Sequence, residues 1–111
     1  MITDHRGDVR VSVFSGGDLY RKADGERIGR ALVKDVSGTG LKVETLESLS
    51  VGETAFIDFQ IGKTAVFMRV PVRVERIRSH AGSFLAGMSF LQEEDRAQVR
   101  KALSKLFAPV E

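Results

Sequence analysis

Two short segments of the chain carry side chains that could bind a ligand. Arg6 and Arg10 lie four residues apart near the N-terminus, and Asp35, Ser37 and Gly40 follow together in one later segment. A guanidinium group offers a planar fork of donors that matches phosphate and carboxylate groups. In an extended chain two arginines at this spacing share one side, about 13 Å apart. Taken singly, each segment also has a plain structural explanation: solubilising charge in a tail, and an ordinary β-turn.

The remaining reactive side chains do not form a catalytic or metal-binding pattern. His5 and His80 are far apart in the sequence and lack metal-ligand spacing. Glu93, Glu94 and Asp95 stand where a helix is expected to begin, and acidic residues complement the helix dipole there. The absence of cysteine excludes disulfides and thiolate chemistry. The sequence therefore predicts no enzyme, no metal and no cofactor.

Length and charge define the class of protein. At 111 residues the chain fits one domain, and 17 basic against 15 acidic residues leave a net charge of +2. This charge is too small for a dedicated DNA or RNA binder, so placed arginines would have to hold any anion. The first ten residues do not resemble a signal peptide, and no apolar run approaches the roughly 20 residues of a membrane helix. We expect a cytoplasmic protein without membrane insertion, as a monomer or homodimer.

Apolar periodicity predicts the structural elements. Alternation with period two indicates six short strands, at 19–22, 27–34, 41–44, 54–61, 65–78 and 83–91. The fifth of these is expected to place five apolar side chains on one inward face: Val66, Met68, Val70, Val72 and Val74. The period then changes to that of an amphipathic helix over 93–108.

Each of the six strands has one apolar face, and closure of the sheet into a barrel is the simplest way to bury all six faces. We expect an all-β fold with one C-terminal helix, a six-stranded antiparallel barrel with the helix capping one end. The single domain 1–111 would comprise a flexible N-terminal arm at 1–17, the barrel at 18–92 and the helix at 93–108.

The order of the two segments resembles the PilZ family. Arg6 and Arg10 spell Arg-x-x-x-Arg, and 35–40 spells Asp-x-Ser-x-x-Gly. Further landmarks of the family follow in the same order, at 24–26, 49–53, 86–91 and 93–96, so the resemblance covers nearly the whole chain. It implies a PilZ-type barrel that binds the second messenger cyclic di-GMP (c-di-GMP).

Carried over by motif, the resemblance assigns ligand contacts to Arg6, Arg10, Asp35, Ser37 and Gly40. The chemistry is suitable: guanine presents N7 and O6 as paired acceptors that arginine meets bidentately, and its N1–H and N2–H donors suit a carboxylate. A serine hydroxyl can bond a phosphate oxygen or a base edge. Glycine permits a turn or a close approach of the ligand.

Four more residues are weaker candidates for the same ligand: His5, Gly38, Arg30 and Arg69. His5 precedes the first arginine, where members of the family vary, so the resemblance is compatible with one or two bound ligand molecules. Gly38 belongs to the second motif, and the two arginines could form a basic wall on the barrel. The arm before Val11 is expected to be mobile when the site is empty and to become ordered on binding.

The function implied by the resemblance is that of a single-domain receptor or adaptor. It would relay the level of cyclic di-GMP to a protein partner in trans, in the control of motility, pili, biofilm or polysaccharide. The alternative is a PilZ-like protein-interaction module that does not bind nucleotide. A single-stranded nucleic-acid barrel is disfavoured, because Phe59, Phe84 and Phe90 fall on apolar faces rather than on a basic groove.

Overall fold

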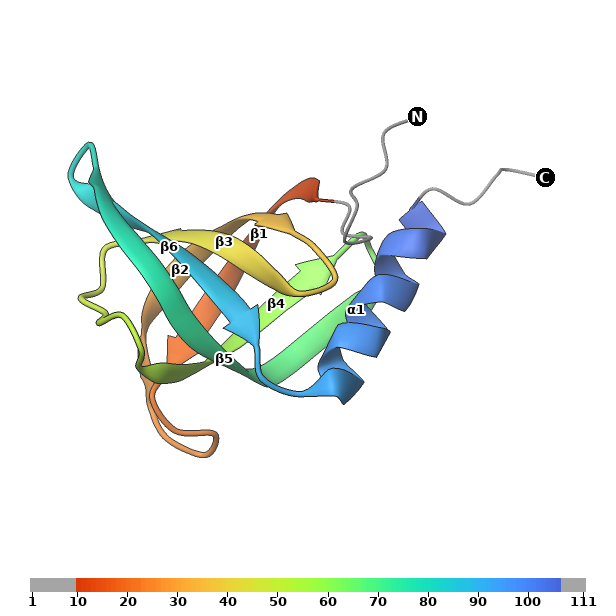
Figure 1. Cartoon of the computed structure of the whole chain (residues 1–111), viewed down its shortest axis with the longest axis horizontal. Coiled ribbons are helices and arrows are strands. Elements are labelled where there is room, and N and C mark those ends of the chain that lie inside the picture. The colour runs from red at the N-terminus through yellow and green to blue at the C-terminus, as the bar shows by residue number, and fades with distance from the viewer. Residues whose placement is uncertain (1–9, 107–111) are drawn as a thin grey trace.

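The computed structural model describes residues 10–106 and contains six strands followed by one helix (Figure 1). The elements are β1 Val11–Tyr20, β2 Arg27–Val36, β3 Gly40–Thr45, β4 Thr54–Ile61, β5 Ala65–His80, β6 Ser83–Phe90 and α1 Glu93–Leu106. All neighbouring strands are antiparallel, in the closed order β1-β2-β3-β6-β5-β4. The predicted barrel with a C-terminal helix is confirmed.

The core fills the barrel and extends under the helix. Alternate residues of each strand point inward, and the fully buried ones include Leu19, Val33 and Ile57. Val99 and Leu103 of α1 belong to the same apolar cluster, so the helix covers one end of the barrel (Figure 1). Within residues 10–106, no helix is long and apolar enough to cross a membrane.

The predicted boundary between arm and barrel at 17/18 is wrong, because residues 11–17 belong to β1. Ser12 pairs with Asp35 of β2, so the strand begins well before the predicted position. Later in β1, position 17 must be a glycine, because a Cβ atom there would lie 2.3 Å from the carbonyl oxygen of Asp58 in β4. The predicted arm at 1–9, with its expected mobility, and the last predicted residues of the helix lie outside the described residues.

The inward face predicted for the longest strand is correct only in its second half. Val70, Val72 and Val74 are buried, whereas Val66 and Met68 are 60% and 62% exposed. The pairing of β5 with β4 shifts between these two groups, and the intervening Arg69 takes a positive φ of 52°. This β-bulge reverses which face of β5 points inward.

Candidate functional site

The fold brings the two predicted ligand-binding segments together. Arg10 immediately precedes β1 and Asp35 is the penultimate residue of β2, and the pairing of Ser12 with Asp35 places these strand ends side by side. Arg10 Nη1 donates a hydrogen bond to Asp35 Oδ1 at 2.5 Å. The Arg10 side chain is 51% exposed and that of Asp35 only 15%, so the carboxylate is held at the surface beneath the guanidinium group.

Ser37 shapes the turn between β2 and β3. Its backbone N–H donates to the Gly40 carbonyl at 2.8 Å, and its hydroxyl accepts from the Thr39 N–H at 3.2 Å. Ser37 is 1% exposed. In this arrangement its hydroxyl is engaged inside the turn, and a direct contact with the ligand stays a prediction.

The barrel itself requires a glycine at position 40, independently of any ligand. Gly40 pairs with Ser89 at the junction of β3 and β6, where a Cβ atom would stand 2.0 Å from the Met88 carbonyl oxygen. Phe90 N–H donates to the Thr39 carbonyl at 2.9 Å beside it. Gly40 therefore allows two backbones to approach closely and keeps the turn against the barrel.

Of the weaker candidates, Arg30 is engaged elsewhere on β2. Its Nε lies 3.2 Å from Asp18 Oδ1 and donates to the Gly17 carbonyl at 3.4 Å. It stands five residues before Asp35, about 16 Å along the strand. The structure does not bring Arg30 to the turn.

Arg69 belongs to a separate cluster on β1, β4 and β5. Its guanidinium carbon lies 3.6 Å from the centroid of the Tyr20 ring, and its backbone N–H donates to Asp58 Oδ1 at 2.7 Å. The Tyr20 hydroxyl donates to Asp58 Oδ2 at 2.9 Å. Burial raises the pKa of Tyr20, and the hydrogen bond to Asp58 adds to the rise. Tyr20 ends β1, about 33 Å along the chain from Arg10, so this cluster supports the barrel wall rather than the turn.

The remaining predicted residues are only partly placed. Arg6 and His5 lie outside the described residues, and their roles stay predictions. Gly38 lies between Ser37 and Thr39 in the turn itself and is buried, so its contact with a ligand stays a prediction.

A surface hollow of about 290 Å³ adjoins Arg10 and is lined by basic side chains that the sequence analysis did not identify. Lys42 of β3, Gly87 of β6 and Arg76 of β5 line it together with Arg10. Glu75 also lines it, and its carboxylate accepts a hydrogen bond of 2.6 Å from the hydroxyl of Ser89. The pairing of strands far apart in the sequence creates this group, so no local motif could have identified it.

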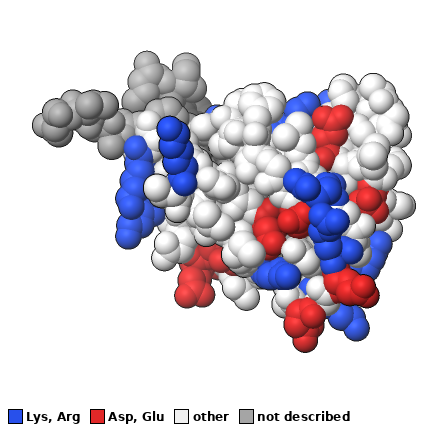
Figure 2. All heavy atoms as spheres, turned by 180° about the vertical axis from the view of Figure 1, so that it is seen from behind, with Lys and Arg blue, Asp and Glu red and all other residues white. Residues whose placement is uncertain are grey.

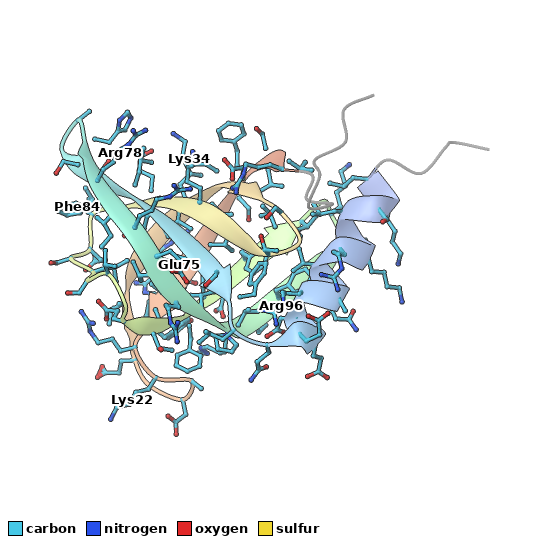
Figure 3. All side chains as sticks on the ribbon, viewed as in Figure 1. Lys22, Lys34, Glu75, Arg78, Phe84 and Arg96 are labelled. Carbon is cyan, nitrogen blue, oxygen red and sulfur yellow. The ribbon has the colours of Figure 1, made fainter. Side chains whose placement is uncertain are left out.

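The charges on the molecular surface are mixed in sign. On the face behind the view of Figure 1, Figure 2 shows basic and acidic side chains interleaved over the right half. Figure 3 places Glu75 near the middle of the β5–β6 hairpin and Arg78 closer to its tip.

Among residues 10–106, no group of three or more histidine or acidic side chains could hold a metal ion. Three cations and one carboxylate around a hollow can bind a molecule that carries negative charge together with donor groups.

Comparisons with known proteins agree with the motifs and the barrel. The family model described as PilZ domain matches residues 4–108. Among solved structures, YcgR of Escherichia coli in complex with c-di-GMP is similar with a TM-score of 0.70 and 20% identity, over 92% of this chain and 46% of that chain. The Bacillus subtilis inhibitor of motility, MotI/DgrA, gives 0.69 and 16% identity, over 93% and 52%. The isolated PilZ domain of E. coli YcgR with c-di-GMP gives 0.63 and 18%, over 93% and 98%.

These likenesses establish the fold, at identities too low to transfer a ligand. The chain spans about half the length of the first two structures. A comparison with curated proteins finds no match.

Proposed function

Since the chain belongs to the PilZ domain family, we propose that it is a receptor for cyclic di-GMP that relays the level of this second messenger to a protein partner. The observation that carries the proposal is the 2.5 Å contact between Arg10 and Asp35. It joins the end of the arginine motif to the start of the second motif across 25 residues of sequence.

The contact explains how a ligand would be recognised. In this structure Arg10 and Asp35 satisfy each other at the protein surface. A guanine offers both complements: N7 and O6 accept from a guanidinium group, and N1–H and N2–H donate to a carboxylate. Binding would exchange one exposed ion pair, which contributes little in water, for charge-assisted contacts with a purine and a phosphate.

The similar structures support the class of function. The YcgR structures contain c-di-GMP, and MotI/DgrA is named for inhibition of motility. By analogy the present domain would act on a partner in the control of motility, pili, biofilm or polysaccharide. PilZ domains are known as receptor and adaptor modules, and we propose that this chain acts by binding in the cytoplasm, without catalysis.

The proposal is tested by isothermal titration calorimetry with cyclic di-GMP. Wild type, Arg6→Ala, Arg10→Ala and Asp35→Asn are compared with Arg73→Ala, which removes the same charge from an exposed position of β5 outside the hollow. Loss of one arginine contact is expected to weaken binding by about 1–3 kcal/mol, roughly 5- to 150-fold. Arg73→Ala should bind as wild type.

Two results would contradict the proposal. A flat titration of folded wild type removes the ligand and favours the alternative of a protein-interaction module. Equal weakening by Arg10→Ala and Arg73→Ala would reduce the interaction to general attraction between charges.

A further inference from the structure

We propose that the groove between α1 and the β4–β5 hairpin binds a protein partner, through a segment of that partner in which acidic side chains flank apolar ones. The inference rests on the proposed function, in which the domain acts on a partner in trans, and it names the surface that would make the contact. Residues 61–70 and one side of α1 line this hairpin groove, whereas Arg10 and the turn between β2 and β3 do not.

The hairpin groove is concave and has a defined end. Its volume is about 580 Å³, and it runs between α1 and the first half of β5 (Figure 1). The end of the helix contacts the hairpin turn, because a Cβ atom at Gly62 would lie 3.2 Å from Leu106 Cδ2. A volume of this size is typical of protein binding pockets. The concave shape suits an inserted segment of chain better than a flat bilayer.

Three large apolar side chains are exposed along the groove. Val66 and Met68 of β5 are 60% and 62% exposed, and Leu106 of α1 is 45% exposed. None of the three belongs to the apolar core of the barrel. Apolar side chains that gather on one exposed surface are typical of an interaction site, and methionine adapts well to different partners.

A buried polar network keeps two of these side chains turned outward. Val66 and Met68 face solvent because of the β-bulge at Arg69, whose positive φ of 52° is unfavourable for a residue with a Cβ atom. The buried Asp58 holds this conformation: its Oδ1 accepts from the Arg69 N–H at 2.7 Å, and its Oδ2 accepts from the Tyr20 hydroxyl at 2.9 Å. A strained backbone that is held in place beside an exposed apolar surface points to a use for that surface.

Lysines beside the apolar side chains indicate the charge of the partner. Lys63 lies in the hairpin turn, and Lys101 and Lys105 lie on α1; all three are exposed and line the groove. Within residues 10–106 none of the three forms an ion pair. Among the described residues that line the groove, only Asp95 is acidic. In Figure 2 basic side chains stand beside an uncharged surface on the left, the side on which α1 lies. An acidic segment complements this balance of charge.

The test uses two synthetic peptides with one apolar pattern and opposite charge. A fluorescent amphipathic peptide with glutamate at its polar positions is compared by anisotropy with the same peptide carrying lysine there. The glutamate peptide is expected to bind at least about 10-fold more tightly, and added salt should weaken its binding. Changes in amide chemical shift should concentrate at 61–70 and 101–106. Vesicles of phosphatidylglycerol are tested beside the peptides by sedimentation.

Charge-reversal variants identify the surface. Met68→Glu puts a like charge among the apolar side chains and should weaken binding of the glutamate peptide about 10-fold or more. Lys101→Glu changes a charge at the rim, so it should weaken this binding about 2- to 5-fold and strengthen binding of the lysine peptide. Leu46→Glu and Lys22→Glu make the same changes at exposed positions outside the groove and should bind as wild type. Thermal unfolding verifies that each variant keeps the fold.

The results distinguish this proposal from the receptor function. Met68→Glu and Lys101→Glu should bind cyclic di-GMP as wild type in calorimetry, because neither residue lines the hollow beside Arg10. If the glutamate peptide does not bind, or if Met68→Glu and Leu46→Glu weaken it equally, the docking groove is overturned and the receptor is untouched. Vesicle binding that Met68→Glu abolishes, without peptide binding, assigns the surface to a membrane and also overturns the proposal. A folded wild type that binds the glutamate peptide in the groove but not cyclic di-GMP supports the groove and overturns the receptor.

Discussion

The substitution Gly40→Ala tests whether the last residue of the second motif holds the fold or only the ligand. A methyl group at this position would stand 2.0 Å from the Met88 carbonyl oxygen, whereas ordinary van der Waals contact begins near 3.4 Å. The obstacle is backbone, so it cannot rotate away as a side chain would. The start of β3 and the end of β6 must move apart by about 1.4 Å.

The cost of this movement follows from the hydrogen bonds beside Gly40. Separation disturbs the bond of 2.9 Å from the Phe90 N–H to the Thr39 carbonyl and the bond of 2.8 Å from the Ser37 N–H to the Gly40 carbonyl. Each is worth about 0.5–1.5 kcal/mol net, and strain from overpacking adds about 1–3 kcal/mol. The free energy of unfolding should fall by about 2–6 kcal/mol. In a domain near 100 residues this lowers Tm by at least about 8 °C.

Gly87→Ala is the matched control, because it adds the same methyl group to the neighbouring strand. Its nearest contacts are side-chain atoms of Arg76 at 3.2 Å and 3.3 Å, which can move at little cost. Thermal and urea unfolding, followed by circular dichroism, should show a large loss for Gly40→Ala and a change within about 1 kcal/mol for Gly87→Ala. Equal stability of the two variants would refute the close approach of β3 and β6 as the reason for Gly40.

Three further predictions concern the core, the pH dependence and the ligand. Phe90→Ala removes a ring that is 2% exposed and should lower the free energy of unfolding by about 3–5 kcal/mol in urea titrations. Hydrogen bonds from Arg96 at 2.9 Å and Arg100 at 2.8 Å lower the pKa of Glu93. Wild type should therefore exceed Glu93→Gln in stability above the ordinary pKa of glutamate, and this advantage should vanish as the pH falls through the lowered value, measured by urea unfolding across that range. Cyclic di-GMP at 100 times its Kd should stabilise wild type by about 2.7 kcal/mol in a thermal-shift assay, and the same concentration should stabilise Arg10→Ala less.

Local pattern was enough to predict most of the strands. In 54–61 the alternate residues Ala55, Ile57, Phe59 and Ile61 are buried, as the apolar alternation predicts. A strand of this kind needs only one apolar face and a partner strand on either side. The turn between β2 and β3, at 37–39, is likewise indicated by residue types that favour turns. Such features depend on neighbours in the sequence, so the sequence reports them directly.

Features that depend on distant partners were missed. β1 begins at Val11 and passes through Gly16 and Gly17, which have low strand propensity, and only pairing with β2 and β4 holds it extended. Lys42 and Arg76 are separated by 34 positions and meet only because β3 and β5 both flank β6. No spacing rule connects them, so the wall of the site could be found only in the structure.

The second motif combines two physical roles, and this affects how its variants should be interpreted. Asp35 carries a surface charge that faces Arg10, whereas Ser37 and Gly40 are used by the backbone of the turn and by the approach of β6. Loss of binding in a Ser37 or Gly40 variant can arise because the turn no longer presents Asp35, without any lost contact to ligand. Loss of binding in Asp35→Asn with unchanged Tm can arise only at the site itself. Stability measured beside affinity therefore separates the residues that hold the ligand from those that hold the turn.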